Sequence, residues 1–251
     1  SHLPTGYRAL NSKNLATPVP AGVVRPQRFF DTILFTGDGS SSKEVTGLEF
    51  KPDLVWMKGR TSMNHYIVDS VRGRASALFP NDDSAEQTSS SSQDLVEFND
   101  HGFVVGTPTR ASSSNNNGTN IVAWCWKAGG AAVTNTVGNI SAQVSANDEA
   151  GFSIITYTGD GNSSGNVGTG LRSTQPLDWA IVKRRDDTSD WQVGHIASGQ
   201  SSNFAYHTNL NDTSALSGSA PYHMGTQNAT NGDRLYLASG GLTSSATYVA
   251  Y

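Results

Sequence analysis

Hydrophobic and polar residues alternate in short runs along this chain, and clusters of Gly, Asn, Asp and Ser separate the runs. Such alternation is typical of half-buried β-strands, because successive side chains on a strand point to opposite faces. In the first part of the chain the pattern predicts strands over residues 31–36, 54–58, 65–69, 103–106 and 120–127. Helical periodicity is weak, and the best candidate is a short helix over 94–99.

Three blocks of sequence return in the same order in the second part of the chain. The blocks are FTGDG at 35–39 with YTGDG at 157–161, PDLVWMKGR at 52–60 with DWAIVKRR at 178–185, and IVAW at 121–124 with YVAY at 248–251. Chance rarely preserves the order of separate blocks, so the sequence predicts a tandem duplication.

The duplication predicts a division of the chain into four parts. They are an extended Pro-rich linker over 1–29, a first module over 30–129, a connector over 130–150 and a second module over 151–251. Many short strands within about 100 residues favour a two-sheet sandwich. We therefore expect an all-β protein of two tandem jelly-roll-like β-sandwich modules. Because the chain starts without Met and ends in a strand-like run, we also expect a fragment that follows an upstream domain.

Composition excludes several classes of protein. The 251 residues are 36% hydrophobic and only 15% charged, with a net charge of −4 and 9% aromatic residues. Low net charge with aromatic residues argues against disorder, and the absence of a Lys/Arg cluster argues against nucleic-acid binding. No apolar run is long enough for a membrane helix. The single cysteine, Cys125, excludes an internal disulfide framework.

The TGDG loops at 36–39 and 158–161 follow strands in both repeats. They could be phosphate or calcium loops, but the Lys and Ser/Thr of a nucleotide loop and the further oxygen ligands of a calcium loop are missing. A β-turn is the favoured interpretation, because Gly supplies positive φ and Asp binds backbone N–H groups.

The run 121–127 contains Trp124, Cys125 and Trp126. Alternation places Val122 and both tryptophans on one face, and Ile121, Ala123 and Cys125 on the other. This segment could be an aromatic platform for sugar rings, but a core strand with a buried, inert thiol is favoured.

Charged residues follow the matching strands at 58–60 and 183–187. They could form a cationic patch for an anionic glycan, although a solvated rim is favoured. The six histidines and scattered carboxylates match no catalytic or metal-binding motif. No catalytic, cofactor-binding or metal-binding residue is predicted, and a glycosidase carboxylate pair would need convergence that sequence does not reveal.

The chain resembles phage virion proteins, namely tail-fibre or other virion structural proteins of marine phages and cyanophages. A junction at 6–18 (GYRALNSKNLATP) carries the resemblance, together with FTG at 35–37, PDLVW at 52–56, DSVRG at 69–73, AWCWKAGG at 123–130 and VKR at 182–184. The resemblance covers essentially the whole chain and transfers no catalytic residue. The second repeat departs from it, because Tyr251 stands where the first has Trp124.

The resemblance implies a non-enzymatic virion structural protein, exposed outside the cell on the phage tail or particle surface. We expect part of a tail fibre or similar appendage that contributes to host-surface recognition, with a homo-oligomer (a trimer) and other virion proteins as partners. A capsid decoration protein and a polysaccharide depolymerase are the other hypotheses for its role in a virion.

A carbohydrate-binding module or lectin is the alternative from a different class. It requires exposed aromatic side chains, and Trp191, Tyr206 and Tyr222 lie outside the clearest core strands. These three residues are the predicted contacts to a host surface glycan. No cofactor, nucleic-acid partner or membrane insertion is expected.

Overall fold

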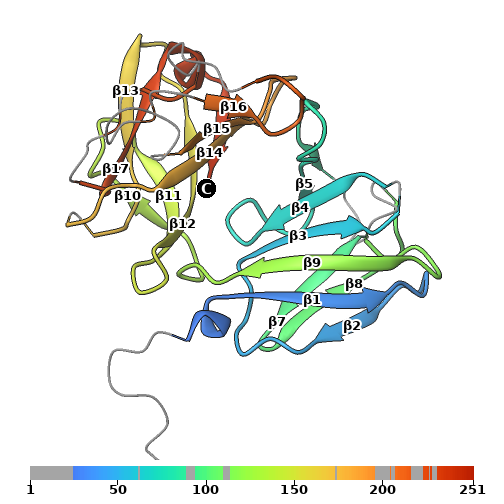
Figure 1. Cartoon of the computed structure of the whole chain (residues 1–251). Helices are drawn as coiled ribbons and strands as arrows, with labels where there is room; N and C mark the ends of the chain where they lie inside the picture. Colours follow the sequence, from blue (N-terminus) through green and yellow to red (C-terminus); the bar gives the residue numbers. More distant parts are fainter. Residues whose placement is uncertain are drawn as a thin grey trace, which may run out of the picture.

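The computed structural model describes residues 25–61, 63–88, 94–109, 114–172, 174–195, 204, 207–215, 223–225, 227 and 231–251. The described chain is all-β and is built from several antiparallel sheets, consistent with a β-sandwich class of fold (Figure 1). We call residues 25–129 the first half and residues 130–251 the second half. Within the described residues, every ladder joins strands of the same half.

The first half begins with a short 3-10 helix, Pro26–Arg28, and continues in strands. The strands are β1 (Phe30–Thr36), β2 (Lys43–Thr46), β3 (Leu54–Gly59), β4 (His65–Asp69), β5 (Ser76–Ala77), β6 (Gln87–Thr88), β7 (Leu95–Asn99), β8 (Gly102–Val105) and β9 (Asn120–Trp126). The first main sheet has the order β1-β9-β3-β4, and a cover sheet has the order β2-β8-β7. Side chains such as Val55, Tyr66 and Cys125 from the main sheet meet Val45 and Phe103 from the cover sheet in one core.

The second half also contains a main sheet and a smaller cover sheet. Its strands are β10 (Val133–Asn135), β11 (Ala142–Asn147), β12 (Phe152–Thr158), β13 (Ser164–Gly168), β14 (Trp179–Arg184), β15 (Gln192–His195), β16 (His207–Asn209), β17 (Arg234–Ala238) and β18 (Thr247–Ala250), with a 3-10 helix at Ser239–Leu242 before β18. The second main sheet has the order β10-β11-β12-β18-β14-β15-β16, and β13 pairs with β17 in a second cover sheet. Val167 and Leu235 of the cover sheet pack on Ile155, Val182 and Tyr248 of the main sheet.

The two main sheets repeat one strand order and one register. The order β1-β9-β3-β4 corresponds to β12-β18-β14-β15. Phe35 lies opposite Ile121 in the first half, and Tyr157, its counterpart in the repeat, lies opposite Tyr248 in the second. The sequence blocks thus occupy equivalent strands, although the predicted domain boundaries stay a prediction.

The strands predicted in the first half are all present, but the predicted helix over 94–99 is wrong. Leu95–Asn99 forms β7, which pairs with β8 so that Phe98 lies opposite Phe103. Asp94 has a φ of 67°, outside the helical region, and the cross-strand pairing outweighs weak local helix propensity.

The segment 130–150, predicted as a connector, contains two strands of the second main sheet. β10 pairs with β11, and β11 pairs with β12 through Val144 opposite Ile155. Ala142 and Val144 are buried while Gln143 is exposed. The buried residues are small, so the alternation was weak in sequence. Residues 1–24 of the predicted linker lie outside the described residues.

Candidate functional site

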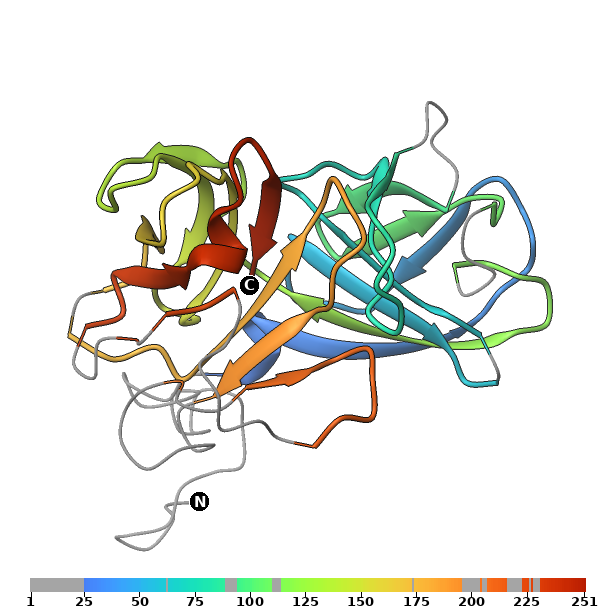
Figure 2. The same ribbon diagram turned by 90° about the horizontal axis from the view of Figure 1, so that it is seen from above.

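The two halves meet through the outer faces of their main sheets. Leu54, Ile67 and Leu78 of the first half share a buried cluster with Ile154 and Val249 of the second half. The chain end, labelled C, lies between the two halves in both views (Figures 1 and 2). This cluster is separate from the two sandwich cores, so burial of apolar surface holds the halves together.

A buried network of charged groups lies beside this cluster. Arg72 Nε donates to Asp69 Oδ2 at 2.5 Å and Arg72 Nη1 to Glu86 Oε2 at 2.8 Å, and all three side chains are almost fully buried. From the second half, Arg185 Nη2 donates to Glu86 Oε1 at 2.7 Å, and the Tyr251 hydroxyl donates to Asp69 Oδ2 at 2.7 Å. The network therefore links the halves by charge-assisted hydrogen bonds.

The network keeps Arg72 and Glu86 in their charged states. Burial lowers the pKa of Arg72, but the charges of Asp69 and Glu86 outweigh burial and raise the pKa above its usual range. Burial raises the pKa of Glu86, but hydrogen bonds from Arg185 and the charge of Arg72 outweigh it and lower the pKa overall. Burial raises the pKa of the Tyr251 hydroxyl, so this group remains a neutral donor.

Trp191, predicted as an exposed glycan contact, is fully buried in the contact between the halves. Its Nε1 atom donates to the carbonyl oxygens of Phe79 at 3.1 Å and Asp82 at 3.0 Å. The expectation of an exposed ring is therefore wrong, because the indole is covered by a loop more than a hundred residues away in sequence. The other two predicted contacts, Tyr206 and Tyr222, lie outside the described residues.

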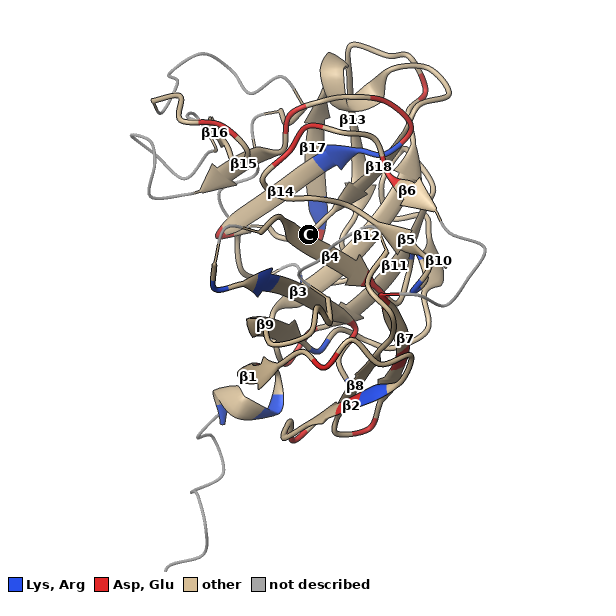
Figure 3. Ribbon diagram, turned by 90° about the vertical axis from the view of Figure 1, so that its right-hand side faces the viewer, with Lys and Arg blue, Asp and Glu red and all other residues tan. Residues whose placement is uncertain are grey.

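Lys183 is also buried at this contact, which corrects the prediction of a solvated rim at 183. Its Nζ atom donates to the carbonyl oxygens of Arg184 at 2.6 Å and Asp83 at 3.2 Å. Burial lowers the pKa of Lys183 to about 8. Figure 3 shows Lys and Arg scattered over the ribbon, with the end of β14 next to acidic residues of the facing loop.

The roles predicted for Gly and Asp in the loops at 36–39 and 158–161 are confirmed. Gly39 and Gly161 have φ values of 71° and 81°, and the carboxylates accept from backbone N–H groups two residues on, Asp38 from Ser40 and Asp160 from Asn162. Within the described residues, no group of three or more His, Cys, Asp or Glu side chains is arranged to hold a metal ion.

The strand with Trp124, Cys125 and Trp126 has the predicted alternation. Cys125 is buried in the first core, and burial raises the pKa of its thiol. The indoles lie on the outer face, where Trp124 contacts Trp56 edge-on and Trp126 stacks on Phe152 of the second half. They are therefore covered partly by their neighbours and partly by the other half.

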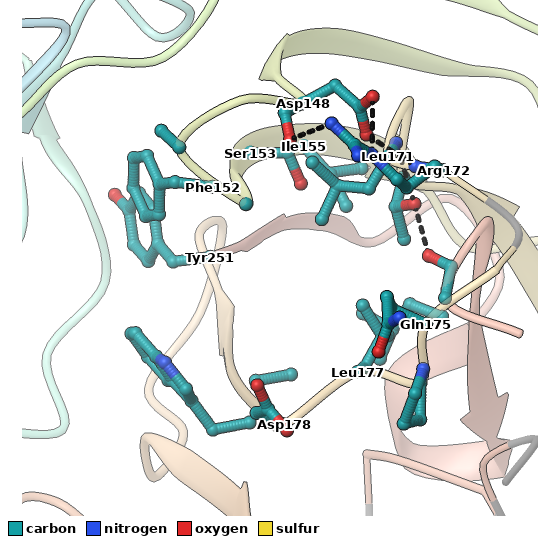
Figure 4. Close-up of a pocket in the computed structure, with 18 of the residues that line it drawn as sticks. Asp148, Phe152, Ser153, Ile155, Leu171, Arg172, Gln175, Leu177, Asp178 and Tyr251 are labelled. Carbon is teal, nitrogen blue, oxygen red and sulfur yellow. Dashed lines mark hydrogen bonds and ion pairs between the residues drawn. The ribbon is translucent and has the colours of Figure 1, made fainter. Parts of the chain in front are cut away.

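A pocket of about 400 Å³ opens in the second half beside this contact. Figure 4 shows the rings of Phe152 and Tyr251 side by side on one wall, with Gln175 and Leu177 on the opposite wall and Asp178 at the lower edge. Phe152 comes from β12, Tyr251 directly follows β18, and Gln175, Leu177 and Asp178 precede β14.

The pocket combines aromatic surface with polar groups at its rim. Trp179 lines it and keeps 38% of its surface exposed. At the upper edge Arg172 Nε donates to Asp148 Oδ2 at 2.8 Å, in an exposed ion pair. A shaped pocket of this kind can bind a ligand by ring contacts and hydrogen bonds. Sequence reasoning missed the pocket. When the two repeats are matched, Trp179 corresponds to Leu54, which is buried. The large aromatic residue at this position was the signal that could have indicated a site.

Comparison with known families gives one match. A family described as a domain of unknown function (DUF7483) matches residues 25–251. The chain belongs to this family. The DUF7483 match covers both halves, including the pocket and the contact between them. The curated proteins and the solved structures contain no significant match to the chain. In the described residues, no helix is long and apolar enough to cross a membrane.

Proposed function

We propose that this chain is a non-enzymatic structural protein of a phage virion. It forms part of a tail fibre or similar appendage on the particle surface and contributes to host-surface recognition. The resemblance of its sequence blocks to phage virion proteins suggests this role. The observation that carries the proposal is the buried contact between the halves, where Arg72 and Arg185 share Glu86.

A virion appendage must transmit force and resist proteases without unfolding. In this chain the halves are joined by an apolar cluster and by a buried ionic network in addition to the connecting peptide. Breaking such a network leaves buried charged groups without their partners. Separation of the two halves therefore costs free energy. The turn-rich loops present hydroxyl and amide groups to the surroundings, which suits contact with a host surface.

Immunogold electron microscopy with an antibody against the chain tests this proposal on particles from the source sample. We expect label on tail appendages. Label on the capsid would instead identify a decoration protein, and particles without label would overturn the virion role. Light scattering at micromolar concentration tests the proposed trimer, and a monomer there would contradict it.

A carbohydrate-binding module is the second candidate, and the pocket lined by Phe152, Trp179 and Tyr251 favours it. Stacking of a sugar ring on an aromatic face needs an exposed ring, which Trp179 supplies. A glycan array tests this candidate. Binding that is lost in Trp179→Ala and kept in Leu34→Ala, a change at an exposed residue of the other half, would support it. An array without signal would contradict it.

A further inference from the structure

An open groove of about 840 Å³ is lined by residues of both halves and is separate from the pocket beside Tyr251. The first half supplies the loop before β3, the loop after β4, part of β7 and the residues that follow β9. The second half supplies the residues before β10 and the end of β11. Figure 1 shows β9 ending toward the second half. The groove has the size of a ligand-binding site.

Three positively charged side chains line this groove without a partner. Lys51, Arg74 and Lys127 make no ion pair and no side-chain hydrogen bond within the described part of the chain. Apart from Arg28 and Arg60, the other described Lys and Arg side chains donate to a carboxylate or to a carbonyl oxygen. The unpaired cations are therefore concentrated at the groove, where they can bind an anion.

The carboxylates of the groove are mostly engaged with partners of their own. Asp53 is buried and accepts from Ala128 N at 2.8 Å, and Asp148 accepts from Arg172 Nε at 2.8 Å. Glu97 is exposed, and its carboxylate makes no such contact within the described residues. Three cations and one carboxylate therefore remain for a ligand, although the whole chain has a net charge of −4.

Small and apolar residues between the cations keep the groove wide. Gly73 and Gly130 have φ values of 90° and 79°. At both glycines, no atom outside the adjacent residues lies within 4 Å of the point where a Cβ would stand. Ala131 and the half-buried ring of Phe98 also line the groove. A ligand can therefore rest on an uncharged surface while its anionic groups reach the cations.

We propose that this groove binds an acidic polysaccharide, namely a chain of uronic-acid units. Carboxylates of the chain bind Lys51, Arg74 and Lys127, and the C–H faces of the sugar rings lie on the glycines and on Phe98. Ion pairs between the cations and the carboxylates provide the charge complementarity. This inference rests on the proposed contact with a host surface, which supplies the polysaccharide.

An acidic polysaccharide fits the groove better than an acidic peptide or a nucleic acid does. A peptide would add to the edge strand β7, but the register shift between Leu95 and Glu97 interrupts the edge, and such bulges oppose strand addition. A nucleic acid carries a phosphate on every nucleotide and binds to extended basic surfaces, which a chain of net charge −4 with three free cations here does not offer. A uronate chain requires only a few cations.

Titration calorimetry on the full chain at low salt tests this proposal, with galacturonate and mannuronate hexamers as the probes. At least one hexamer should bind, and its methyl ester, which keeps the sugar chain without the charges, should bind much more weakly. The double variant Lys51→Gln/Arg74→Gln should bind about tenfold more weakly, since each exposed ion pair contributes about a factor of three. The control Arg28→Gln/Arg60→Gln removes the same charge at exposed residues outside the groove and should change affinity less than about twofold.

Two further variants make the test specific to the groove. Glu97→Gln removes the unpaired carboxylate and should strengthen binding about twofold, whereas Trp179→Ala, in the other pocket, should leave it unchanged. Equal losses in the two double variants would show attraction by overall charge and would overturn the proposal. Failure of both hexamers to bind would also overturn it, even with antibody label on tail appendages, and binding to particles without label would leave the groove assigned and reject the virion role.

Discussion

Lys58 and Lys183 occupy the same position in the two repeats, yet their surroundings differ. Lys58 is half-buried and donates to the carbonyl oxygen of Gly59 at 3.1 Å, at the end of its own strand, and to those of Thr61 and Met63 at 3.4 Å in the loop that follows. Lys183 is fully buried and donates to Asp83 of the other half. A duplicated strand order can thus be retained while one copy is adapted to contact the other.

The largest expected effect concerns the ionic network that joins the halves. Arg72→Ala should lower the free energy of unfolding by about 3–5 kcal/mol, because Asp69 and Glu86 stay buried with less compensation. Urea denaturation followed by circular dichroism measures the loss. Arg25→Ala, which removes an exposed ion pair with Glu49, should cost less than about 1 kcal/mol. Similar losses for both variants would show that the network does not stabilise the fold.

The matched lysines give a prediction about pH. The folded-state pKa of Lys183, about 8, lies below its unfolded value of 10.5, so between these pH values the unfolded chain binds more protons and stability rises with pH. Between pH 8 and 10.5, the stability of the wild type relative to Lys183→Met should increase by an amount on the order of 2 kcal/mol. Lys58→Met serves as the matched control for the loss of a lysine side chain. A flat difference for Lys183→Met would contradict burial of a charged lysine.

The next comparison is between Trp191 and His65. His65 lies opposite Lys58, and Trp191 directly precedes Gln192, which lies opposite Val182. Trp191→Phe should cost about 1–3 kcal/mol, because it removes the donor to two carbonyl oxygens of the first half. His65→Phe removes only the acceptor of the Trp56 Nε1 hydrogen bond at 2.9 Å, in a half-buried site, and should cost less than about 1 kcal/mol. Thermal unfolding of both variants tests whether Trp191 contributes more to stability than His65 does.

The smallest expected effect concerns the two loops in which the halves are alike. Gly39→Ala and Gly161→Ala place a side chain at φ values of 71° and 81° in the two equivalent turns. Each should cost about 1 kcal/mol, because L-residues other than Gly disfavour this region. Equal shifts in the melting temperature would support equivalent turns. A difference of several degrees between the variants would show that the turns have diverged.

Sequence reasoning predicted local features well, because their physical signals are local. The alternation in 120–127 predicted which face of β9 enters the core, and Cys125 is buried as expected. The TGDG blocks predicted turns, because Gly at positive φ and Asp bonded to backbone N–H groups are short-range effects. The repeated blocks occupy strands at equivalent places in the two main sheets, in β1-β9-β3-β4 and in β12-β18-β14-β15.

The candidate site could not be predicted in the same way, because it depends on contacts between distant segments. Trp191 lies next to polar residues in sequence, and only the loop at 79–82 buries it. Asp69, Arg72, Glu86 and Arg185 are ordinary charged residues until folding removes them from water and pairs them. The pocket likewise brings together Phe152, Trp179 and Tyr251 from three separate segments, which no single segment of the sequence reveals.

The amino-acid sequence by itself determined the all-β class, the strands of the first half, the turns after them and the repeated order of blocks, because these follow from side-chain alternation and backbone preference over a few residues. Only the tertiary structure decided that 95–99 is a strand, that Lys183 and Trp191 are buried, and that a pocket opens beside Tyr251. The reason is that burial, charge pairing and strand partnership depend on which surfaces meet, and here those surfaces come from residues about a hundred positions apart.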